Sequence, residues 1–305
     1  MKSFFACLLL VSMLVSLCSA AVTCAGNRDP KNMLVSATWL SGHLQDPDLV
    51  IIAVGPRVDY DKAHIAGAQY LDLPSVAAKD SKLTLELPPM AELAQTFRVL
   101  GVSNNSHVVL YAMSNQIQSA TRVFLTLDAM GMGAKTSLLD GGLPLWQNES
   151  RAVTTNVSAS RTGNVEPCAQ TDVIADAQYV RSNLEHKGVN IVDARLPGFY
   201  TGAQIPNGQR AGHMPGAVNI PYISLVDDLG KFKSVTVLAE MFKSAGISPG
   251  DQVVSYCHVG QQATAVYFAA RLLGYDARMY DGSWQEWSAH TEFPVVTSAP
   301  ATAPK

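Results

Sequence analysis

Cys257 is the residue of this sequence best placed to carry out chemistry. It follows Val253-Val254-Ser255-Tyr256, a short apolar run typical of a buried strand, and a helical pattern begins near Ala263. Between them lies the loop Cys257-His258-Val259-Gly260-Gln261-Gln262. Because α/β folds bind ligands at the carboxyl ends of parallel strands, we expect the thiol to lie in a binding site.

The loop that begins at Cys257 is suited to hold a negatively charged sulfur atom. The N–H groups of a short loop that enters a helix converge on one point, and the helix dipole adds partial positive charge there. Such surroundings favour the thiolate, the nucleophilic form of cysteine. Gly260 gives the loop backbone freedom that a side chain would remove. We expect the substrate-binding residues to include His258, Val259, Gly260, Gln261, Gln262 and Ala263, mainly through backbone amides. The side chain of His258 could instead point to solvent.

An internal repeat distinguishes Cys257 from an ordinary buried cysteine. Three landmarks occur in the same order in both halves of the chain, at offsets that shrink by only a few residues. His64–Ala68 corresponds to His213–Ala217, and Val108–Ala112 corresponds to Val253–Cys257. Asp140 corresponds to Asp281, and each is followed six positions later by a tryptophan, Trp146 or Trp287. If the residue at this position were needed only for packing, alanine would be sufficient in both copies. The pairing of Ala112 with Cys257 therefore favours chemistry in the second copy alone.

Each copy alternates short apolar runs rich in β-branched residues with patterns of helical period, as in Ile191–Ala194 and in the segment from Val266 to Leu273. This alternation predicts an α/β fold of two domains, each a parallel sheet with helices on both faces. We expect a first domain at 33–147, a linker at 148–171, a second domain at 172–294 and a disordered tail at 295–305.

Composition agrees with two ordinary domains. The 305 residues are 48% hydrophobic and 15% charged, with a formal net charge of -3 and no long basic run. We therefore expect neither a nucleic-acid partner nor binding to a membrane surface.

Residues 1–20 have the layout of a secretory signal peptide: Lys2, an apolar run from Phe4 to Leu17, then small residues. The apolar run is shorter than the roughly 20 residues of a membrane-spanning helix, so we expect no membrane insertion after cleavage. The sequence predicts an exported protein, periplasmic or secreted. Disulfides form in such compartments, and we predict one between Cys24 and Cys168. Two free cysteines are the alternative.

The second copy resembles a rhodanese domain, and the chain after residue 20 resembles the tandem-domain thiosulfate and 3-mercaptopyruvate sulfurtransferases. Four segments carry the resemblance: Val192–Arg195, Gly212–Ala217, Cys257–Thr264, and Tyr280–Ser283 with Trp284 and Trp287. The resemblance implies that Cys257 takes sulfur from a donor such as thiosulfate or mercaptopyruvate, becomes a persulfide, and passes the sulfur to cyanide or a thiol. It implies no metal and no organic cofactor.

The sequence departs from that family at its anion-binding positions. Phe199 stands where the tandem enzymes usually have an arginine, and His258 is the only potentially cationic side chain of the cysteine loop. Arg195 or Arg210 is therefore expected to bind an anionic donor, although Arg195 could instead pair with Asp193. Asp193, which corresponds to Ala53 in the first copy, is a candidate for supporting the active loop.

Residues present in both copies are more simply explained by structure. His213 and His64 occupy matching turns, so we interpret them as hydrogen-bonding groups of the fold. Asp281 and Asp140 are interpreted as turn or cap residues on the same grounds.

Two other classes of function remain open from the residues. Cys257 could accept sulfur as a noncatalytic carrier, or sense oxidants as a reactive thiol. A cysteine-dependent phosphatase or arsenate reductase is less favoured, because Ala263 stands where such loops are closed by arginine.

Overall fold

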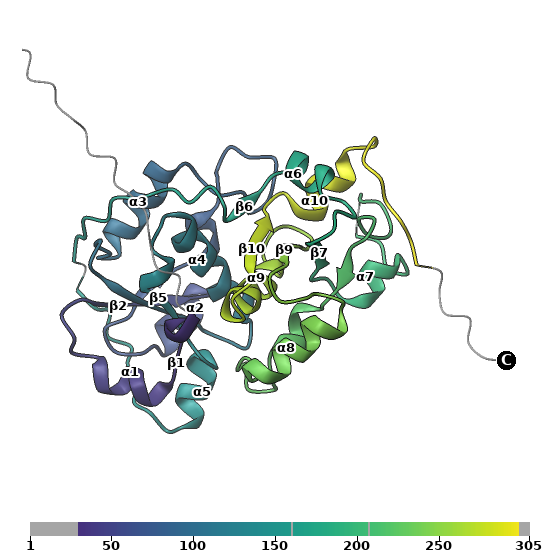
Figure 1. Ribbon diagram of the computed structural model, residues 1–305. Coiled ribbons are helices and arrows are strands. Elements are labelled where there is room, and N and C mark those ends of the chain that lie inside the picture. Colours follow the sequence, from purple (N-terminus) through teal and green to yellow (C-terminus); the bar gives the residue numbers. More distant parts are fainter. Residues whose placement is uncertain (1–29, 160, 207, 299–305) are drawn as a thin grey trace, which may run out of the picture.

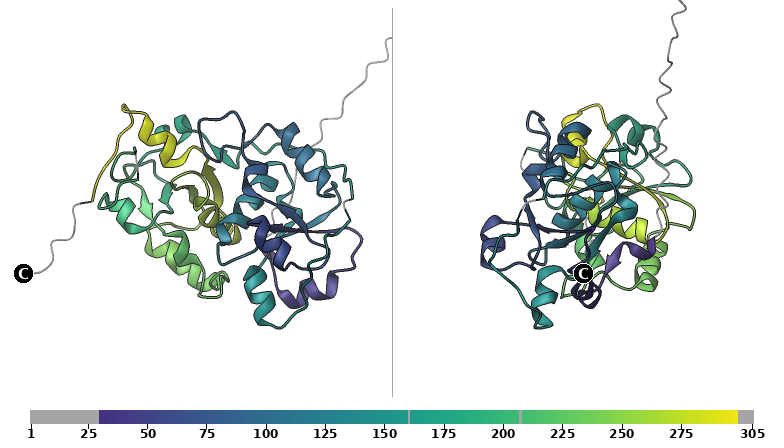
Figure 2. Two further views of the ribbon diagram at one scale, coloured as in Figure 1. Left: turned by 180° about the vertical axis from the view of Figure 1, so that it is seen from behind. Right: turned by 90° about the vertical axis from the view of Figure 1, so that its left-hand side faces the viewer.

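The computed structural model describes residues 30–159, 161–206 and 208–298. Two α/β domains lie side by side, the first coloured from purple to teal and the second from teal through green to yellow (Figure 1). The view from behind shows the same two bodies in contact, and in the view from the side one lies in front of the other (Figure 2).

Each domain contains one five-stranded parallel sheet, and the two sheets have the same strand order, β1-β5-β4-β2-β3 and β6-β10-β9-β7-β8. The internal repeat and the expected fold class are therefore confirmed. The first sheet contains β1 (Leu34–Val35), β2 (Leu49–Val54), β3 (Gln69–Leu71), β4 (His107–Ala112) and β5 (Thr136–Leu139). The second contains β6 (Ile174–Ala175), β7 (Val189–Asp193), β8 (Val218–Asn219), β9 (Gln252–Tyr256) and β10 (Asp276–Tyr280).

Helices cover both faces of each sheet, because the central strands bury side chains that point to either side. The first domain has α1 (Ala37–His43), α2 (Arg57–Lys62), α3 (Met90–Val99), α4 (Ile117–Ala129) and α5 (Gly142–Asn148), with short 3-10 helices η1 (Pro30–Asn32), η2 (Leu73–Val76) and η3 (Gly133–Lys135). The second has α6 (Ala177–Ser182), α7 (Pro197–Thr201), η4 (Tyr222–Leu225), α8 (Val235–Ser244), α9 (Ala263–Leu272) and α10 (Ser283–Ala289).

The two domains share one hydrophobic core through the packing of α4 against α9. Every residue of α4 is buried, and the rings of Phe124 and Phe268 meet edge to face at 4.8 Å. The hydroxyls of Thr121 and Thr264, at matching positions of the two helices, lie 2.7 Å apart. Because α4 and α9 bury a shared hydrophobic core between them, the domains form one unit rather than two bodies joined only by a linker.

The linker packs against the first domain. Val165 is buried, and the Cys168 amide donates to the Met130 carbonyl over 2.9 Å. Cys168 is disulfide-bonded and Cys257 is a free thiol. Cys24 and the signal-peptide segment lie outside the described residues, so the Cys24–Cys168 pairing stays a prediction.

The tail differs in part from the expectation of disorder over 295–305. Val296 exchanges two backbone hydrogen bonds of 2.9 Å with His213, which fixes the chain at that point. Residues 299–305 lie outside the described part of the chain.

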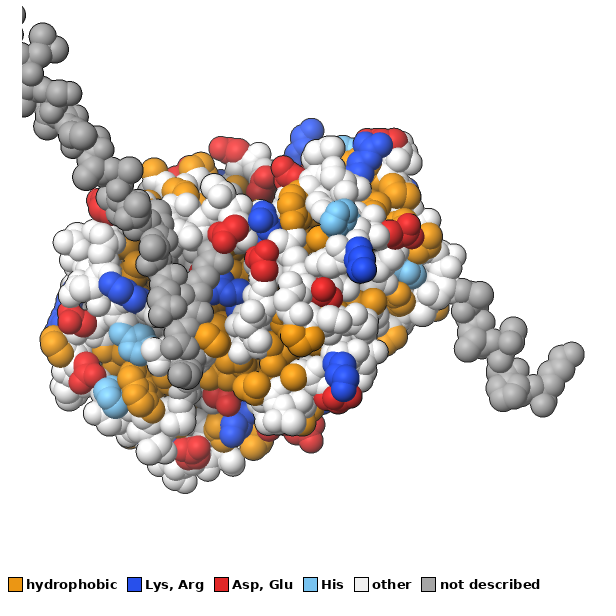
Figure 3. Space-filling view, viewed as in Figure 1, with side chains coloured by type: hydrophobic (Ala, Val, Ile, Leu, Met, Phe, Trp, Pro, Cys, Tyr) orange, Lys and Arg blue, Asp and Glu red, His pale blue; other side chains and the backbone are white. Residues whose placement is uncertain are grey.

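None of the helices among the described residues is long and apolar enough to cross a membrane. On the face in Figure 3, acidic and basic side chains are scattered, and hydrophobic ones gather in the lower middle.

Candidate active site

Cys257 lies at the carboxyl end of β9, directly before the loop that enters α9. Its side chain is fully buried. The Cys257 amide donates to the Ser283 hydroxyl over 3.2 Å, and the Trp284 amide donates to the Cys257 carbonyl over 2.9 Å. The start of α10 therefore fixes the backbone on both sides of the thiol.

The loop offers a set of unused hydrogen-bond donors. Within the described residues, the N–H groups from His258 to Ala263 donate to no protein acceptor. They precede a ten-residue helix, α9, whose N-terminus adds partial positive charge. Buried or half-buried N–H groups without partners are costly, so a negatively charged ligand at this loop would satisfy them.

Gly260 is required by the shape of this loop. Its φ of +77° lies in the left-handed region, and a Cβ built on it would lie 2.7 Å from the Asp281 carbonyl oxygen. Any side chain would therefore be strained and would also collide with backbone.

The first domain reaches the loop through a residue that the sequence analysis missed. Arg122, buried within α4, donates from Nη1 to the Gly260 carbonyl over 3.0 Å and forms an ion pair of 2.5 Å with Asp281. The other oxygen of Asp281 accepts from the Leu87 amide over 2.8 Å. Asp281 is thus a bridge between domains rather than the expected turn or cap residue. A charged residue directly before the apolar run Val123–Leu125 is the signal that could have identified Arg122.

Asp193 and Arg195 form a fully buried pair beside the loop. Arg195 donates to both carboxylate oxygens of Asp193, with the shortest contact at 2.6 Å, and to the Gly212 carbonyl over 2.7 Å. Its guanidinium lies 4.4 Å from the ring centre of Trp284. These contacts give Arg195 a structural role that does not depend on a substrate anion. Of the two roles that the sequence left open for Arg195, the structure shows the pairing with Asp193.

Arg210 is also occupied by the protein. It donates to the carbonyl oxygens of Phe293, Trp287 and His290 over 2.8, 3.0 and 3.1 Å, which ties its own segment to the end of α10. The structure therefore joins Arg210 to the last turn of α10 and to the residues that follow it, and none of these bonds reaches the cysteine loop.

His258 is held against Phe199 of α7. Their rings meet edge to face with centres 4.5 Å apart. Burial first, and then the positive charge of Arg195, lower the pKa of His258 to about 4, against a weaker opposing effect of Asp193. The imidazole is therefore neutral near pH 7, and the loop carries no side-chain cation of its own.

His64 and His213, at equivalent positions of the two copies, stabilise the turns that contain them, in agreement with their presence in both copies. Nδ1 of His64 hydrogen-bonds the Tyr60 carbonyl, and Nδ1 of His213 hydrogen-bonds the Tyr200 carbonyl, both at 2.7 Å. Each imidazole also stacks on the ring of that tyrosine.

The corresponding site of the first domain is not built in the same way. β4 ends at Ala112 and α4 begins at Ile117, so the connection Met113–Gln116 is one residue shorter than His258–Gln262 and contains no glycine. Asp140, the counterpart of Asp281, accepts a hydrogen bond of 2.9 Å from the Phe232 amide of the second domain. The two domains thus exchange equivalent contacts, but only one of them surrounds a thiol.

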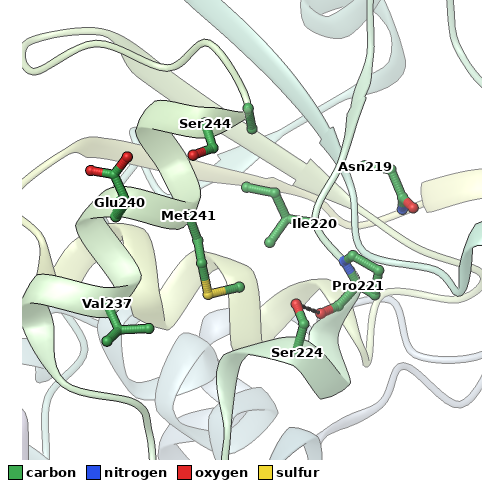
Figure 4. Close-up of a pocket in the computed structure, with 9 residues that line it drawn as sticks. Asn219, Ile220, Pro221, Ser224, Val237, Glu240, Met241 and Ser244 are labelled. Carbon is green, nitrogen blue, oxygen red and sulfur yellow. Dashed lines mark hydrogen bonds between the residues drawn. The ribbon is translucent and has the colours of Figure 1, made fainter.

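A separate cavity of about 520 Å³ lies between α8 and the connection from β8 to η4 (Figure 4). Its lining includes Ile220, Pro221 and Met241 but no residue of the cysteine loop. The Asn219 side chain on its border donates to the carbonyls of Asp193 and Arg195 over 2.8 and 2.9 Å. Within the described residues, no three His, Cys, Asp or Glu side chains are grouped so as to hold a metal ion.

The sequence matches the rhodanese-like domain family twice, over residues 36–149 and 176–290. The chain belongs to this family. It is 32% identical over 281 residues to the sulfur carrier protein TtuD of Thermus thermophilus, covering 87% of this chain and 96% of that protein. It is 32% identical over 273 residues to the 3-mercaptopyruvate sulfurtransferase of Rattus norvegicus, covering 83% and 91%.

Among solved structures, the rhodanese-family chain is similar to SseA, a 3-mercaptopyruvate sulfotransferase from Escherichia coli. The TM-score is 0.75 at 28% identity, with 83% of this chain and 99% of SseA covered. The whole two-domain arrangement is therefore shared, and the resemblance noted from the motifs is confirmed.

Proposed function

We propose that this protein is a sulfurtransferase that moves sulfane sulfur through a persulfide on Cys257. The observation that carries the proposal is the position of the thiol at the start of a loop whose N–H groups, from His258 to Ala263, donate to no acceptor among the described residues. The names of relatives that span nearly the same length support the same activity.

With thiosulfate as donor, the thiolate of Cys257 would attack the outer sulfur. A new S–S bond forms, the S–S bond of thiosulfate breaks, and sulfite leaves with the electron pair. The acceptor, cyanide or a thiolate, then attacks the terminal sulfur of the persulfide and restores the Cys257 thiolate. Each half-reaction is a displacement at sulfur, and the covalent intermediate divides the transfer into two steps.

The negative charge of the persulfide would be stabilised by backbone amides and the N-terminus of α9, because fixed dipoles need no reorganisation during the reaction. Arg195 and Arg210 remain proposed substrate-binding residues only if a bound donor displaces their present protein partners. Asp193 would support the loop by holding Arg195.

Steady-state assay with thiosulfate or mercaptopyruvate and a thiol or cyanide acceptor tests the proposal. Repeated turnover is expected from the parent protein and none from Cys257→Ser. Absence of turnover in the parent would reject the enzymatic function.

A carrier function is the second candidate, because one relative spanning nearly the whole chain is named a sulfur carrier protein. A carrier would take up one sulfur per chain from a small donor and stop, whereas an enzyme would continue when an acceptor is added. The same assay, followed beyond one equivalent, separates the two.

We also propose that the protein acts outside the cytoplasm. The apolar segment near the N-terminus has the layout of a signal peptide, and Cys168 is disulfide-bonded, which suits an oxidising compartment. Peptide mapping of the unreduced mature protein should recover Cys24 joined to Cys168. Finding both thiols free would reject the pairing.

A further inference from the structure

We infer that Arg122, which belongs to the domain without a cysteine, positions the sulfur-binding loop of the other domain. The inference rests on the proposed function of Cys257 and adds a role for the first domain. Arg122 would be a positioning residue, since it acts on the loop rather than on the transferred sulfur.

Three contacts fix the Arg122 side chain where α4 meets the second domain. Nη1 donates to the Gly260 carbonyl over 3.0 Å and pairs with Asp281 at 2.5 Å, while Nη2 donates to the Leu85 carbonyl. The guanidinium is fully buried. Because guanidinium donors have a rigid planar geometry, these acceptors hold the group in one orientation.

The bond to Gly260 determines where one loop amide points. In a planar trans peptide, the carbonyl of one residue and the N–H of the next face opposite ways. The Gly260 carbonyl is held toward Arg122, so the N–H of Gln261 is directed away from Arg122. That N–H is one of the loop donors without a protein acceptor in the described structure.

Because Asp281 neutralises the charge of Arg122, we expect Arg122 to act on the loop by fixing the position of its backbone rather than by its charge. The carboxylate of Asp281 also accepts from the Leu87 amide over 2.8 Å. The Asp281 carbonyl lies where a side chain on Gly260 would have to go. One ion pair thus joins the loop, the turn before α10 and the first domain.

The same interface contains a matched control. Arg271 of α9 pairs with Asp128 of α4, and this ion pair also joins the domains and is also buried. Arg271 lies in the last turn of α9, at the opposite end from the loop, and its hydrogen bonds are to Asp128 and Tyr267. Loss of Arg271 would weaken the interface without touching the cysteine loop.

The experiment compares Arg122→Met, Arg122→Lys and Asp281→Asn with Arg271→Met in the full chain. For each, the rate of sulfur loading on Cys257 is measured by mass in a single turnover with thiosulfate, together with amide hydrogen exchange of the peptide that contains the loop and the melting temperature. Misplacement of reacting groups by a remote substitution slows reactions by roughly tenfold to a hundredfold. We expect the rate of sulfur loading in Arg122→Met to fall by that factor, and amide hydrogen exchange of the loop peptide to become faster.

Arg122→Lys separates position from charge. Lysine retains the positive charge but cannot present the same fork of donors to Gly260 and Leu85, so loading should remain slow. Asp281→Asn keeps the size of the side chain but removes its charge. It should also slow sulfur loading and speed hydrogen exchange of the loop. Arg271→Met should lower the melting temperature while loading stays within about twofold of the parent, since distant sites act independently.

Parent-like loading and loop exchange in a folded Arg122→Met protein would overturn the inference, as would an equal loss in Arg271→Met. If Arg122→Met does not fold, the test uses Arg122→Lys and Asp281→Asn instead. Parent-like loading and loop exchange in both of these variants would then overturn the inference. If the parent itself takes up no sulfur, the proposed function fails, whereas loop exchange still tests the positioning role of Arg122.

Discussion

The guanidinium of Arg122 lies 3.0 Å from the carbonyl oxygen of Gly260, although 138 positions separate the two residues in the chain. The contact joins the domain that lacks a cysteine to the loop that follows Cys257. Through this contact the first domain supports the backbone of the loop in the second.

Gly260→Ala should reduce both stability and sulfur transfer. A left-handed φ costs alanine about 1–2 kcal/mol, and here the added Cβ would also lie 2.7 Å from the Asp281 carbonyl oxygen. Urea unfolding and the single-turnover loading rate measure the two effects.

Gly274→Ala is the control for that substitution. Gly274 has a φ of +83°, and nothing lies within 4 Å of a Cβ built on it. It should lose stability from the backbone alone and keep the parental loading rate. Equal loading rates in the two variants would contradict the assigned role of Gly260.

His258→Gln should make stability less sensitive to acid. Burial and Arg195 lower the pKa of native His258 to about 4, whereas an unfolded histidine titrates near about 6.5. Between these values the unfolded state binds more protons, so this group removes stability as the pH falls from about 6.5 toward 4. Free energies of unfolding at pH 7 and pH 5 should differ less in the variant than in the parent.

An unchanged acid sensitivity in His258→Gln would show that the imidazole of His258 is not kept neutral by its surroundings.

Phe199→Arg should improve the use of thiosulfate. Phe199 contacts His258 beside the loop, while Arg195 and Arg210 are bound to protein groups. A guanidinium placed there could bind the anionic donor, and a hydrogen bond to a charged group contributes about 1.5–3 kcal/mol, or about tenfold or more in kcat/KM. Phe199→Leu removes the ring without adding charge and should give no gain. A folded Phe199→Arg protein with parental kcat/KM would contradict the prediction.

Ala112→Cys should not create a second reactive centre. The connection Met113–Gln116 is shorter than the cysteine loop and has no glycine, so a thiol at 112 would not face an equivalent set of amides. Digestion and mass spectrometry after thiosulfate treatment should find added sulfur at Cys257 only. Equal loading at both positions would show that loop shape is not what makes the thiol reactive.

The sequence was sufficient to predict the fold and the position of the thiol. β9, the loop and α9 follow from a short apolar run, a glycine and a helical period, all of which are local patterns. The pairing of Asp193 with Arg195, only two positions apart, was open to the same reasoning.

Contacts between distant segments could not be predicted. Neither the bond of Arg122 to Gly260 nor the bonds of Arg210 to the end of α10 leaves a local pattern, because each depends on how separate elements pack. The sequence predicts that Arg210 binds a substrate anion and that Asp281 caps a turn. The structure instead pairs Asp281 with Arg122 of the first domain. It bonds Arg210 to carbonyl oxygens at the end of α10, and binding of an anion by Arg210 stays a prediction.

The most direct measurement of the central claim is the intact mass of the mature protein after treatment with thiosulfate or mercaptopyruvate, beside Cys257→Ser. The account predicts one added sulfur atom on the parent, lost again when cyanide or a thiol is added, and none on the variant. Sulfur uptake by Cys257→Ser, or a parent protein that gains no mass from either donor, would contradict it.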